Sequence, residues 1–335
     1  VATGAHGSVT LWDAHDFTRV RTLGGPPGSP PPAALGSSPF PPVTSLGEAF
    51  SIDVSRDGRL VAVARFDGTL RVWDVETGED AFTVRAGPTF PRQLWMDVTW
   101  NHAGDLLAIA TNDGTTGRVT VLDRAGREVA VLQEDYGIAV GGVAFSPDGE
   151  QLITTRLPTV ESEPDDGQVV IWDWKEREVE RAIDAPARHV VLSPTGDLIA
   201  SDAPTQASYL GDTVHVWDAA SGQRVSTLTG HSGGVLDLEF SPDGSRLATA
   251  SSNGTIWMWD PRSGEPIEVL RGHDGAVSSV AFSPDGSRLA SVGSEGVVRV
   301  WALDLDELVR IAEHELTRDL TDAECRQYLH QPNCG

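Results

Sequence analysis

Short runs of alternating apolar and polar residues recur along the chain, and most of them end in the pair Trp-Asp. Two clear runs are Thr255-Ile256-Trp257-Met258-Trp259 and Val297-Val298-Arg299-Val300-Trp301. A period of two, rich in β-branched and aromatic residues, predicts a β-strand. The closing pairs, including two degenerate copies, are Trp12-Asp13, Trp73-Asp74, Leu122-Asp123, Trp172-Asp173, Trp217-Asp218, Trp259-Asp260 and Trp301-Ala302. Their spacing shortens along the chain toward the regular period of a repeat architecture, which predicts seven repeats.

Turn signals separate the predicted strands within each repeat. Ser-Pro-Asp-Gly occurs at 146–149, 241–244 and 283–286, with variants at 55–58 and 193–196. Proline presets φ at the second turn position and glycine tolerates a positive φ, so the chain reverses there between two strands. After each Trp-Asp pair, a second polar turn such as Asp260-Pro261-Arg262-Ser263-Gly264 leads to a further strand.

Four short strands per repeat predict the blade of a β-propeller. The phrases Gly272-His273, Phe282-Ser283-Pro284-Asp285-Gly286, Leu289-Ala290-Ser291 and Val300-Trp301 resemble the WD40 repeat, and the resemblance covers residues 1–303. We therefore expect an all-β, seven-bladed WD40 propeller over 1–303. An unrelated β-sandwich is the alternative, but it gives no reason for Trp-Asp to recur at blade spacing.

The resemblance to WD40 repeats also implies a buried hydrogen-bond chain of His, Ser or Thr, Asp and Trp in a blade. Both repeats that contain Gly-His replace the Asp, and the other repeats lack Gly-His, so we expect partial networks with a structural rather than catalytic role. The implied members are His231, Thr249, Asn253 and Trp259 in the sixth repeat, and His273, Ser291, Glu295 and Trp301 in the seventh.

The pattern changes after Trp301. Leu305, Leu308, Ile311 and Leu316 follow helical spacing, and Asp304 with Glu307 forms a capping box, so 304–335 is predicted to be a short helical tail. The tail is expected either to cap the propeller edge or to dock another protein. Its sequence from Leu316 onward resembles the C-termini of bacterial multidomain WD40 proteins, including STAND-class signalling ATPases. That resemblance implies an architecture with upstream domains and assigns no activity.

Charge and composition narrow the class of partner. The chain has 49 acidic and 25 basic residues, a formal net charge of −24, which disfavours nucleic acid and anionic membranes. No apolar run approaches the roughly 20 residues of a membrane span. Two cysteines, Cys325 and Cys334, are too few to staple the domain, so a reducing, cytoplasmic location is expected. The strong preference for arginine over lysine favours a bacterial source.

Common motifs for catalysis, cofactors and metals are absent from the sequence. The sequence has no Walker loop, no Gly-x-Ser-x-Gly elbow and no His-Glu-x-x-His helix, so we expect no enzyme activity, no cofactor and no metal. His314, Cys325, His330 and Cys334 have zinc-capable side chains, but their spacing matches no common finger.

Insertions mark the predicted binding surface. Connections between the second and third strands, and between successive blades, lie on the same face of a propeller and are enlarged in the first five repeats. They place aromatic and charged residues on one rim, a composition typical of a protein interface. The candidate rim residues are Phe90, Arg92, Trp95, Tyr136, Glu161, Glu163, Asp165, Asp166 and Tyr209. The alternative is that these loops are solvated and their aromatic residues pack on their own blades.

These observations favour a non-enzymatic protein-interaction or sensor module. A propeller enzyme with a central-channel active site is one alternative, and it would need converging carboxyl or imidazole groups on the innermost strands. Those strands, for example Ile52-Asp53-Val54 and Leu238-Glu239-Phe240, offer few candidates. A structural domain that restrains an upstream effector is the second alternative.

The two ends of the repeat series are incomplete. Val1-Ala2-Thr3-Gly4 aligns with the second strand Leu247-Ala248-Thr249-Ala250, so the first blade lacks its innermost strand. The helical pattern after Trp301 leaves the last blade without its outermost strand. We expect about 20 to 25 upstream residues of a longer protein to supply both strands.

Overall fold

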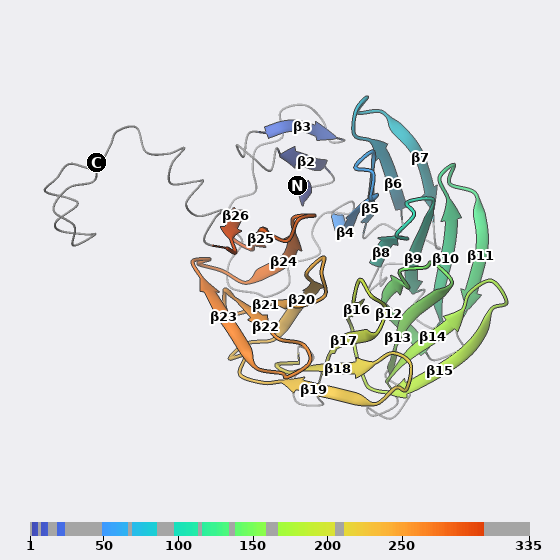
Figure 1. Cartoon of the computed structure of the whole chain (residues 1–335). Helices are drawn as coiled ribbons and strands as arrows, with labels where there is room; N and C mark the ends of the chain where they lie inside the picture. The colour runs from blue at the N-terminus through green and yellow to red at the C-terminus, as the bar shows by residue number, and fades with distance from the viewer. Residues whose placement is uncertain are drawn as a thin grey trace, which may run out of the picture.

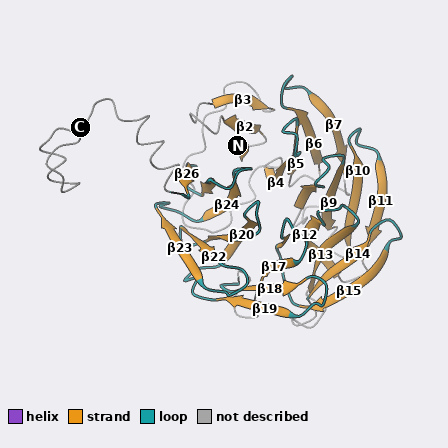
Figure 2. Cartoon of the chain, in the orientation of Figure 1, coloured by secondary structure: helices purple, strands orange, loops and turns teal. Residues whose placement is uncertain are grey.

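The fold consists of β-strands arranged as blades around a common axis (Figure 1). This computed structural model describes residues 2–5, 8–12, 19–23, 49–65, 69–85, 97–112, 116–133, 138–158, 167–204 and 211–304. Within these ranges every regular element is a strand, and the intervening segments are turns and loops (Figure 2). The predicted all-β propeller is confirmed. The predicted helical tail, apart from Asp304, lies outside the described residues.

The strands form antiparallel sheets, numbered here from first to seventh in chain order, of which five have four strands and two have three. The first is β1 (Ala2–Ala5), β2 (Ser8–Trp12) and β3 (Arg19–Leu23). The second to fourth are β4 (Ala49–Val54), β5 (Leu60–Arg65), β6 (Thr69–Asp74) and β7 (Asp80–Arg85); β8 (Asp97–Trp100), β9 (Leu106–Asn112), β10 (Gly117–Asp123) and β11 (Glu128–Gln133); and β12 (Ile138–Phe145), β13 (Gln151–Pro158), β14 (Gln168–Asp173) and β15 (Glu178–Asp184). The fifth to seventh are β16 (Val190–Leu192), β17 (Leu198–Asp202), β18 (Val214–Asp218) and β19 (Arg224–Leu228); β20 (Val235–Phe240), β21 (Leu247–Ser251), β22 (Thr255–Trp259) and β23 (Pro266–Arg271); and β24 (Val277–Phe282), β25 (Arg288–Gly293) and β26 (Val298–Ala302).

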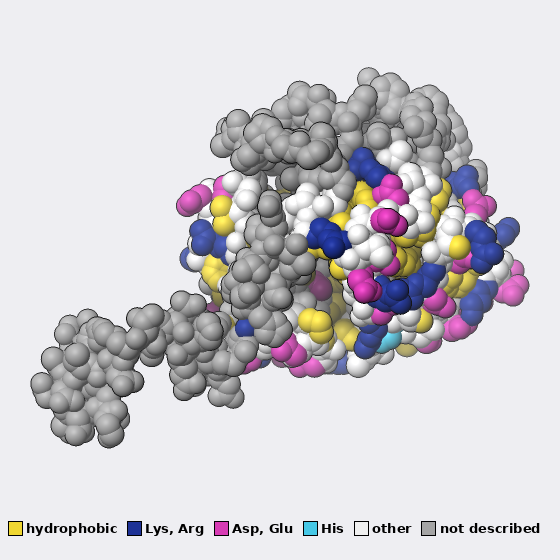
Figure 3. All heavy atoms as spheres, turned by 90° about the horizontal axis from the view of Figure 1, so that it is seen from above, with side chains coloured by type: hydrophobic (Ala, Val, Ile, Leu, Met, Phe, Trp, Pro, Cys, Tyr) yellow, Lys and Arg dark blue, Asp and Glu magenta, His cyan; other side chains and the backbone are white. Residues whose placement is uncertain are grey.

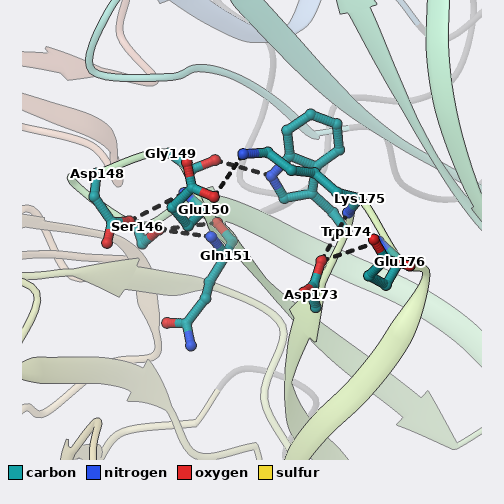
Figure 4. A network of polar contacts seen from close by, with 9 residues as sticks. All are labelled: Ser146, Asp148, Gly149, Glu150, Gln151, Asp173, Trp174, Lys175 and Glu176. Carbon is teal, nitrogen blue, oxygen red and sulfur yellow. Dashed lines mark hydrogen bonds and ion pairs between the residues drawn. The ribbon is translucent and has the colours of Figure 1, made fainter.

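The Ser-Pro-Asp-Gly segments form the predicted turns between first and second strands. In the sixth sheet, Ser241 Oγ donates to Asp243 Oδ1 at 2.6 Å, and the Arg246 N–H donates to Ser241 Oγ at 2.9 Å. Gly244 closes the turn with a φ of 71°, a conformation that costs glycine nothing. The turn at 146–149 has the same contact between Ser146 and Asp148, as Figure 4 shows.

The second kind of turn follows the Trp-Asp pair and uses the Asp as a cap. Asp260 Oδ1 accepts the N–H groups of Arg262 and Ser263, and Gly264 then adopts a φ of 78°. The fourth sheet departs from this pattern. Asp173 caps its turn in the same way (Figure 4), but the residue with positive φ is Arg177, at 63°.

The hydrophobic core lies between neighbouring sheets rather than at one centre. Leu70 and Val72 of the second sheet pack with Leu107 and Ile109 of the third, and all four side chains are fully buried. Trp259 is likewise fully buried and packs toward the fifth sheet. The face of each sheet is therefore covered by the next sheet, as expected for a repeat fold whose units contact their neighbours.

The first and last sheets differ from the others in strand number. In the second to sixth sheets, the second strand contacts the innermost strand of the following sheet. β1 makes this contact with β4, so β1 corresponds to a second strand. The first sheet therefore has no innermost strand among the described residues. The last sheet has no outermost strand there. Val298 and Val300 of β26 are consequently only half-buried, whereas the corresponding Ile256 and Met258 are 0 % and 1 % exposed. The upstream segment that would fill both places stays a prediction.

Replacing Arg177 by glycine should stabilise the protein. A non-glycine residue in the left-handed region costs about 1–2 kcal/mol, of which the greater freedom of glycine in the unfolded chain offsets part. We expect Arg177→Gly to raise the free energy of unfolding by roughly 0.5–1 kcal/mol in urea titrations. Gly264→Ala is the matched control and should destabilise, since its φ is 78° and an added Cβ would lie 3.3 Å from Ser226 Cβ. A loss of stability in Arg177→Gly would contradict the assignment of strain.

Candidate functional site

His231 anchors a hydrogen-bond chain in the sixth sheet. Its Nδ1 lies 3.0 Å from the carbonyl oxygen of Asp212, which can only accept, so Nδ1 carries the proton. Nε2 lies 2.7 Å from Thr249 Oγ1 and accepts from it, while the indole N–H of Trp259 donates to the same hydroxyl at 3.0 Å. Burial lowers the pKa of His231, which fits a neutral imidazole.

Asn253 lies outside this chain, contrary to the grouping expected from the sequence. Its Nδ2 donates to Ser232 Oγ at 2.6 Å, and its Oδ1 accepts from the hydroxyl of Thr255. The short amide of Asn253 thus organises the turn between β21 and β22. The WD40 resemblance implies an acid as the partner of His231, but here that partner is the backbone carbonyl of Asp212.

In the seventh sheet, Glu295 occupies the position that Asn253 has in the sixth. Its longer side chain reaches the histidine of the network. Nδ1 of His273 lies 2.5 Å from Glu295 Oε1, and Nε2 lies 2.7 Å from Ser291 Oγ. The indole N–H of Trp301 donates to Ser291 Oγ at 2.8 Å. Burial alone would raise the pKa of Glu295, but the hydrogen bond and charge of His273 together with two backbone N–H groups outweigh burial and lower that pKa. All four predicted members of this network are therefore in contact.

Two sheets whose repeats lack Gly-His retain part of the hydrogen-bond chain, the contact between the Trp indole and the Ser or Thr hydroxyl. Trp172 Nε1 donates to Thr154 Oγ1 at 2.9 Å, and Trp217 Nε1 donates to Ser201 Oγ at 3.2 Å. These contacts tie the third strand to the second through the indole. The networks lie inside the blades, which supports a structural role for them.

Thr249 offers a direct test of the network. Thr249→Val keeps the shape but leaves the indole of Trp259 and Nε2 of His231 without their shared partner at a fully buried site. We expect a loss of about 2–4 kcal/mol in the free energy of unfolding, the cost of two unpaired buried groups. Thr227→Val, at an exposed position of β19, should change stability by less than about 0.5 kcal/mol. Equal effects of the two substitutions would refute a stabilising role for the network.

The innermost strands carry four half-buried acids, named here the inner carboxylates: Asp53, Asp97, Asp237 and Glu239. The expectation of few candidates on these strands is wrong, because Asp97 and Asp237 join the two acids singled out in the sequence. Each occupies an alternating position on a short inner strand, and that alternation was the signal available.

Each inner carboxylate accepts a backbone N–H from the innermost strand of the next sheet. Asp53 accepts from Trp100 at 2.7 Å and Asp97 from Val143 at 3.0 Å. Two acids of β20 do the same for β24: Asp237 accepts from Val280 at 2.9 Å, and Glu239 accepts from Phe282 at 2.8 Å. Ser51 Oγ also donates to Asp97. The inner carboxylates therefore join neighbouring blades.

Charge on the inner carboxylates opposes folding. Burial raises the pKa of Asp53 to about 6, and burial also raises the pKa values of Asp97, Asp237 and Glu239. The turn acids behave in the opposite way, since the Ser241 hydroxyl and the Ser245 N–H lower the pKa of Asp243 to about 2.

Replacing Asp53 by Asn should therefore change how stability depends on pH. An acid whose pKa is raised on folding binds protons more tightly in the native state, so stability falls as pH rises from about 4 through about 6. Between pH 4.5 and 8 the stability of Asp53→Asn relative to the native chain should improve by about 1–2 kcal/mol, allowing for partial solvation. Denaturant titrations at both pH values measure it.

Asp243→Asn provides the opposite trend as a control. The lowered pKa of Asp243 stabilises the fold above about pH 4, and this stabilisation is lost as pH falls toward 2. The difference in free energy of unfolding between the native chain and Asp243→Asn should therefore shrink on acidification. A relative stability of Asp53→Asn that is independent of pH, or that moves with Asp243→Asn, would disprove the assignment.

The two faces of the propeller differ in the length of their connections. Antiparallel order places the turns between first and second strands, and between third and fourth, at one end of each sheet. These connections are short throughout, as at 55–59, 124–127 and 241–246. At the other end, the connections range from the pair at 6–7, between β1 and β2, to the segment 24–48, between β3 and β4. We call these the uniform face and the variable face.

All nine candidate rim residues lie outside the described residues, so their clustering stays a prediction. Residues that flank the enlarged connections are described. Among them, buried Asn112 bonds both the N–H and the carbonyl of Val140. Arg156 and Gln168 frame the connection at 159–167 and contact each other at 3.1 Å. These contacts fix where the connections leave the scaffold.

On the side of the molecule seen in Figure 3, acidic and basic side chains of the described residues are interspersed. Ion pairs across blades contribute to this on the uniform face, such as Arg124 with Asp57 at 2.7 Å and Arg262 with Asp197. Lys175 and Glu150 pair within the fourth sheet, beside the indole N–H of Trp174, which donates to the carbonyl of Gly149 (Figure 4).

Metal-ligand clusters and membrane-spanning helices are both absent from the described ranges. No group of three or more His, Cys, Asp or Glu side chains there could hold a metal ion. No helix in that part of the chain is long and apolar enough to cross a membrane. Cys325 and Cys334, with His314 and His330, lie outside it.

Comparison with known proteins agrees with the fold. The family model described as "WD domain, G-beta repeat" matches residues 42–74, 126–173, 222–260 and 264–302. The matched residues make up just under half of the chain, and with relatives named for WD repeats they support an assignment to the WD40 family. The fold itself is an all-β propeller. A chain in the crystal structure of the Mitotic Checkpoint Complex shares this fold, with a TM-score of 0.67 and 23% identity over 90% of this chain and 83% of that one.

Curated relatives match this chain over part of its length. Apoptotic protease-activating factor 1 of Danio rerio is 31% identical over 44% of this chain and 11% of its own length. WD repeat-containing protein srw1 of Schizosaccharomyces pombe is 24% identical over 76% and 40%. Angio-associated migratory cell protein of Canis lupus familiaris is 26% identical over 59% and 45%. The chain spans less than half the length of these relatives.

Proposed function

We propose that the chain is a non-enzymatic protein-interaction or sensor module that holds its partner on the variable face. The WD40 propeller is a protein-interaction type of module, and this class of function is the coarse conclusion that the fold supports. The observation that favours the variable face is the contrast in connection length. One face repeats the same short turns, whereas the other carries connections as different as 6–7 and 24–48. Binding residues concentrate on loops that a rigid scaffold positions.

The scaffold beneath the variable face is well braced. Inner carboxylates link successive innermost strands, and Asn112 secures the exit of one enlarged connection on the neighbouring blade. The inner acids act here as acceptors of backbone N–H groups, a use that favours a scaffold over a central-channel enzyme. The rim aromatics Phe90, Trp95, Tyr136 and Tyr209 are the proposed anchors.

The proposal includes a ring of seven blades, a cytoplasmic location and a place within a larger bacterial signalling protein. Seven sheets in the described residues and seven Trp-Asp marks support the blade number. A segment that supplies the two missing strands would complete the first and last blades, because unpaired strand edges expose backbone donors and apolar side chains. The tail at 304–335 is the proposed second contact surface.

Alanine substitution of the rim aromatics tests the binding face. The chain, immobilised, is used to isolate a partner, whose affinity for purified variants is then measured by titration calorimetry. Trp95→Ala and Tyr209→Ala should each weaken binding by more than about 1 kcal/mol, the scale of an interface anchor. Added salt should slow association, because rim charges act on encounter.

Ile267→Ala is the control for that measurement. Ile267 is 55% exposed on the outermost strand β23, away from the variable face, so its removal should leave affinity unchanged. Unchanged affinity in both rim variants would move the site to the uniform face or the tail.

A further inference from the structure

A buried acid lies beside the entry to the innermost strand of the fifth sheet. The backbone N–H groups of Arg188 and His189 both donate to Oδ1 of Asp202, at 2.7 and 2.8 Å. Asp202 is completely buried, and its second oxygen, Oδ2, has no hydrogen-bond partner among the described residues. Oδ2 lies 3.6 Å from Nδ1 of His189, an ion-pair distance.

The fourth sheet shows that the backbone contact needs no charge. Strand pairing aligns Gly142 with His189 and Thr155 with Asp202, because Val143 pairs with Thr154 as Val190 pairs with Ser201. There the Gly142 N–H donates to the neutral hydroxyl of Thr155 at 2.8 Å. The negative charge of Asp202 is therefore available for an interaction other than the backbone contact. The side chain that it faces is His189.

Other charged groups act on this pair from neighbouring elements. Asp237 on β20 and Asp97 on β8 both interact with His189 and favour its protonated form. Arg188, adjacent in sequence, acts in the opposite sense. The His189 side chain is 30% exposed, so water can deliver and remove its proton.

We propose that His189 and Asp202 form a proton-dependent latch, which holds the chain entering β16 against β17 while His189 is protonated. Loss of the proton removes the charge that faces Oδ2 of the buried Asp202 and leaves Arg188 as the remaining cation that acts on this carboxylate. A buried charge that loses a partner is costly. The latch then loosens. The segment it holds, 185–189, is one of the connections of the variable face.

The direction of the pH dependence follows from both partners. Burial favours a neutral His189, but the contact with Asp202 and the charges of Asp202 and Asp237 together outweigh burial and raise the pKa of His189 above 6.5. Burial alone would raise the pKa of Asp202, but His189 outweighs it and lowers that pKa below 3.8. The stabilisation is therefore present between about pH 4 and the raised pKa of His189, and is lost as pH rises through that value.

NMR titration of the histidine rings in the full chain tests the pairing. His189→Gln assigns the resonance, and its pKa in the native chain should lie above 6.5. Asp202→Asn retains an oxygen for the two N–H donors but removes the charge, and should lower the His189 pKa by about one unit or more. The resonance of His231, whose chain contains no carboxylate side chain, should not move between the two proteins.

Amide hydrogen exchange tests the mechanical consequence. After correction for intrinsic rates, segment 185–189 should open about tenfold more often at pH 8.5 than at pH 6, the equivalent of one pKa unit. His189→Gln and Asp202→Asn should abolish that dependence. If Asp202→Asn does not fold, Asp202→Thr copies the neutral arrangement of the fourth sheet.

Three results would each overturn the latch. The first is a His189 pKa at or below 6.5 in the native chain. The second is a His189 pKa that is unchanged when Asp202 is neutralised. The third is a pH dependence of exchange in 185–189 that persists in His189→Gln.

Discussion

A sheet of three or four short strands cannot cover its own faces, and this constraint governs the whole molecule. Each sheet buries its apolar side chains only against the next one, so the core consists of a series of interfaces between blades. Around the axis this arrangement crowds the innermost strands, whose edges facing the axis have no further strand to pair with. Their N–H groups still need acceptors, because an unpaired buried backbone group is costly.

The inner carboxylates supply such acceptors, but their burial disfavours the charged form of each acid. A carboxylate accepts an N–H from a strand it does not pair with, as Asp53 does from Trp100 and Asp97 does from Val143. The same placement removes water from the charge, which raises the pKa of Asp53 to about 6. Ser51 of the second sheet does similar work without charge, since its hydroxyl accepts the N–H of Val98 of the third sheet at 3.3 Å. The chain thus uses charged and neutral acceptors for one geometric task, and the charged ones make its stability sensitive to pH.

The periodic features of the fold were predictable from the sequence because they arise from local chemistry. Strand alternation, the Ser-x-Asp-Gly turns and the Trp-Asp pairs depend on residues within one repeat, and the structure has them at the expected positions. The network of His273, Ser291, Glu295 and Trp301 was also accessible, since a glutamate can reach an imidazole that an asparagine does not reach in the sixth sheet.

Contacts between repeats were less accessible, since they depend on register. Asp97 and Asp237 look unremarkable in the sequence, where each is one polar residue in an alternating strand. Only the relative height of neighbouring innermost strands brings their oxygens to a backbone N–H in the next repeat. The pairing of His189 with Asp202 depends likewise on a strand alignment that neither residue specifies alone.

The division between the two faces follows from the same constraint. On the uniform face the turns also pack against the neighbouring blade: Arg181 of β15 donates to the carbonyl of Ala219, and Ser226 of β19 donates to that of Pro261. A turn that must meet the previous blade at a fixed height has little freedom in length. Contacts between blades also occur on the variable face, but they differ from blade to blade: Asn112 bonds Val140, and His231 bonds the carbonyl of Asp212. Beyond such individual contacts, the length of a connection there can change without disturbing the stack. The length of connections is therefore restricted on the uniform face and free to vary on the variable face. Residues that recognise a partner can change on the variable face without loss of stability.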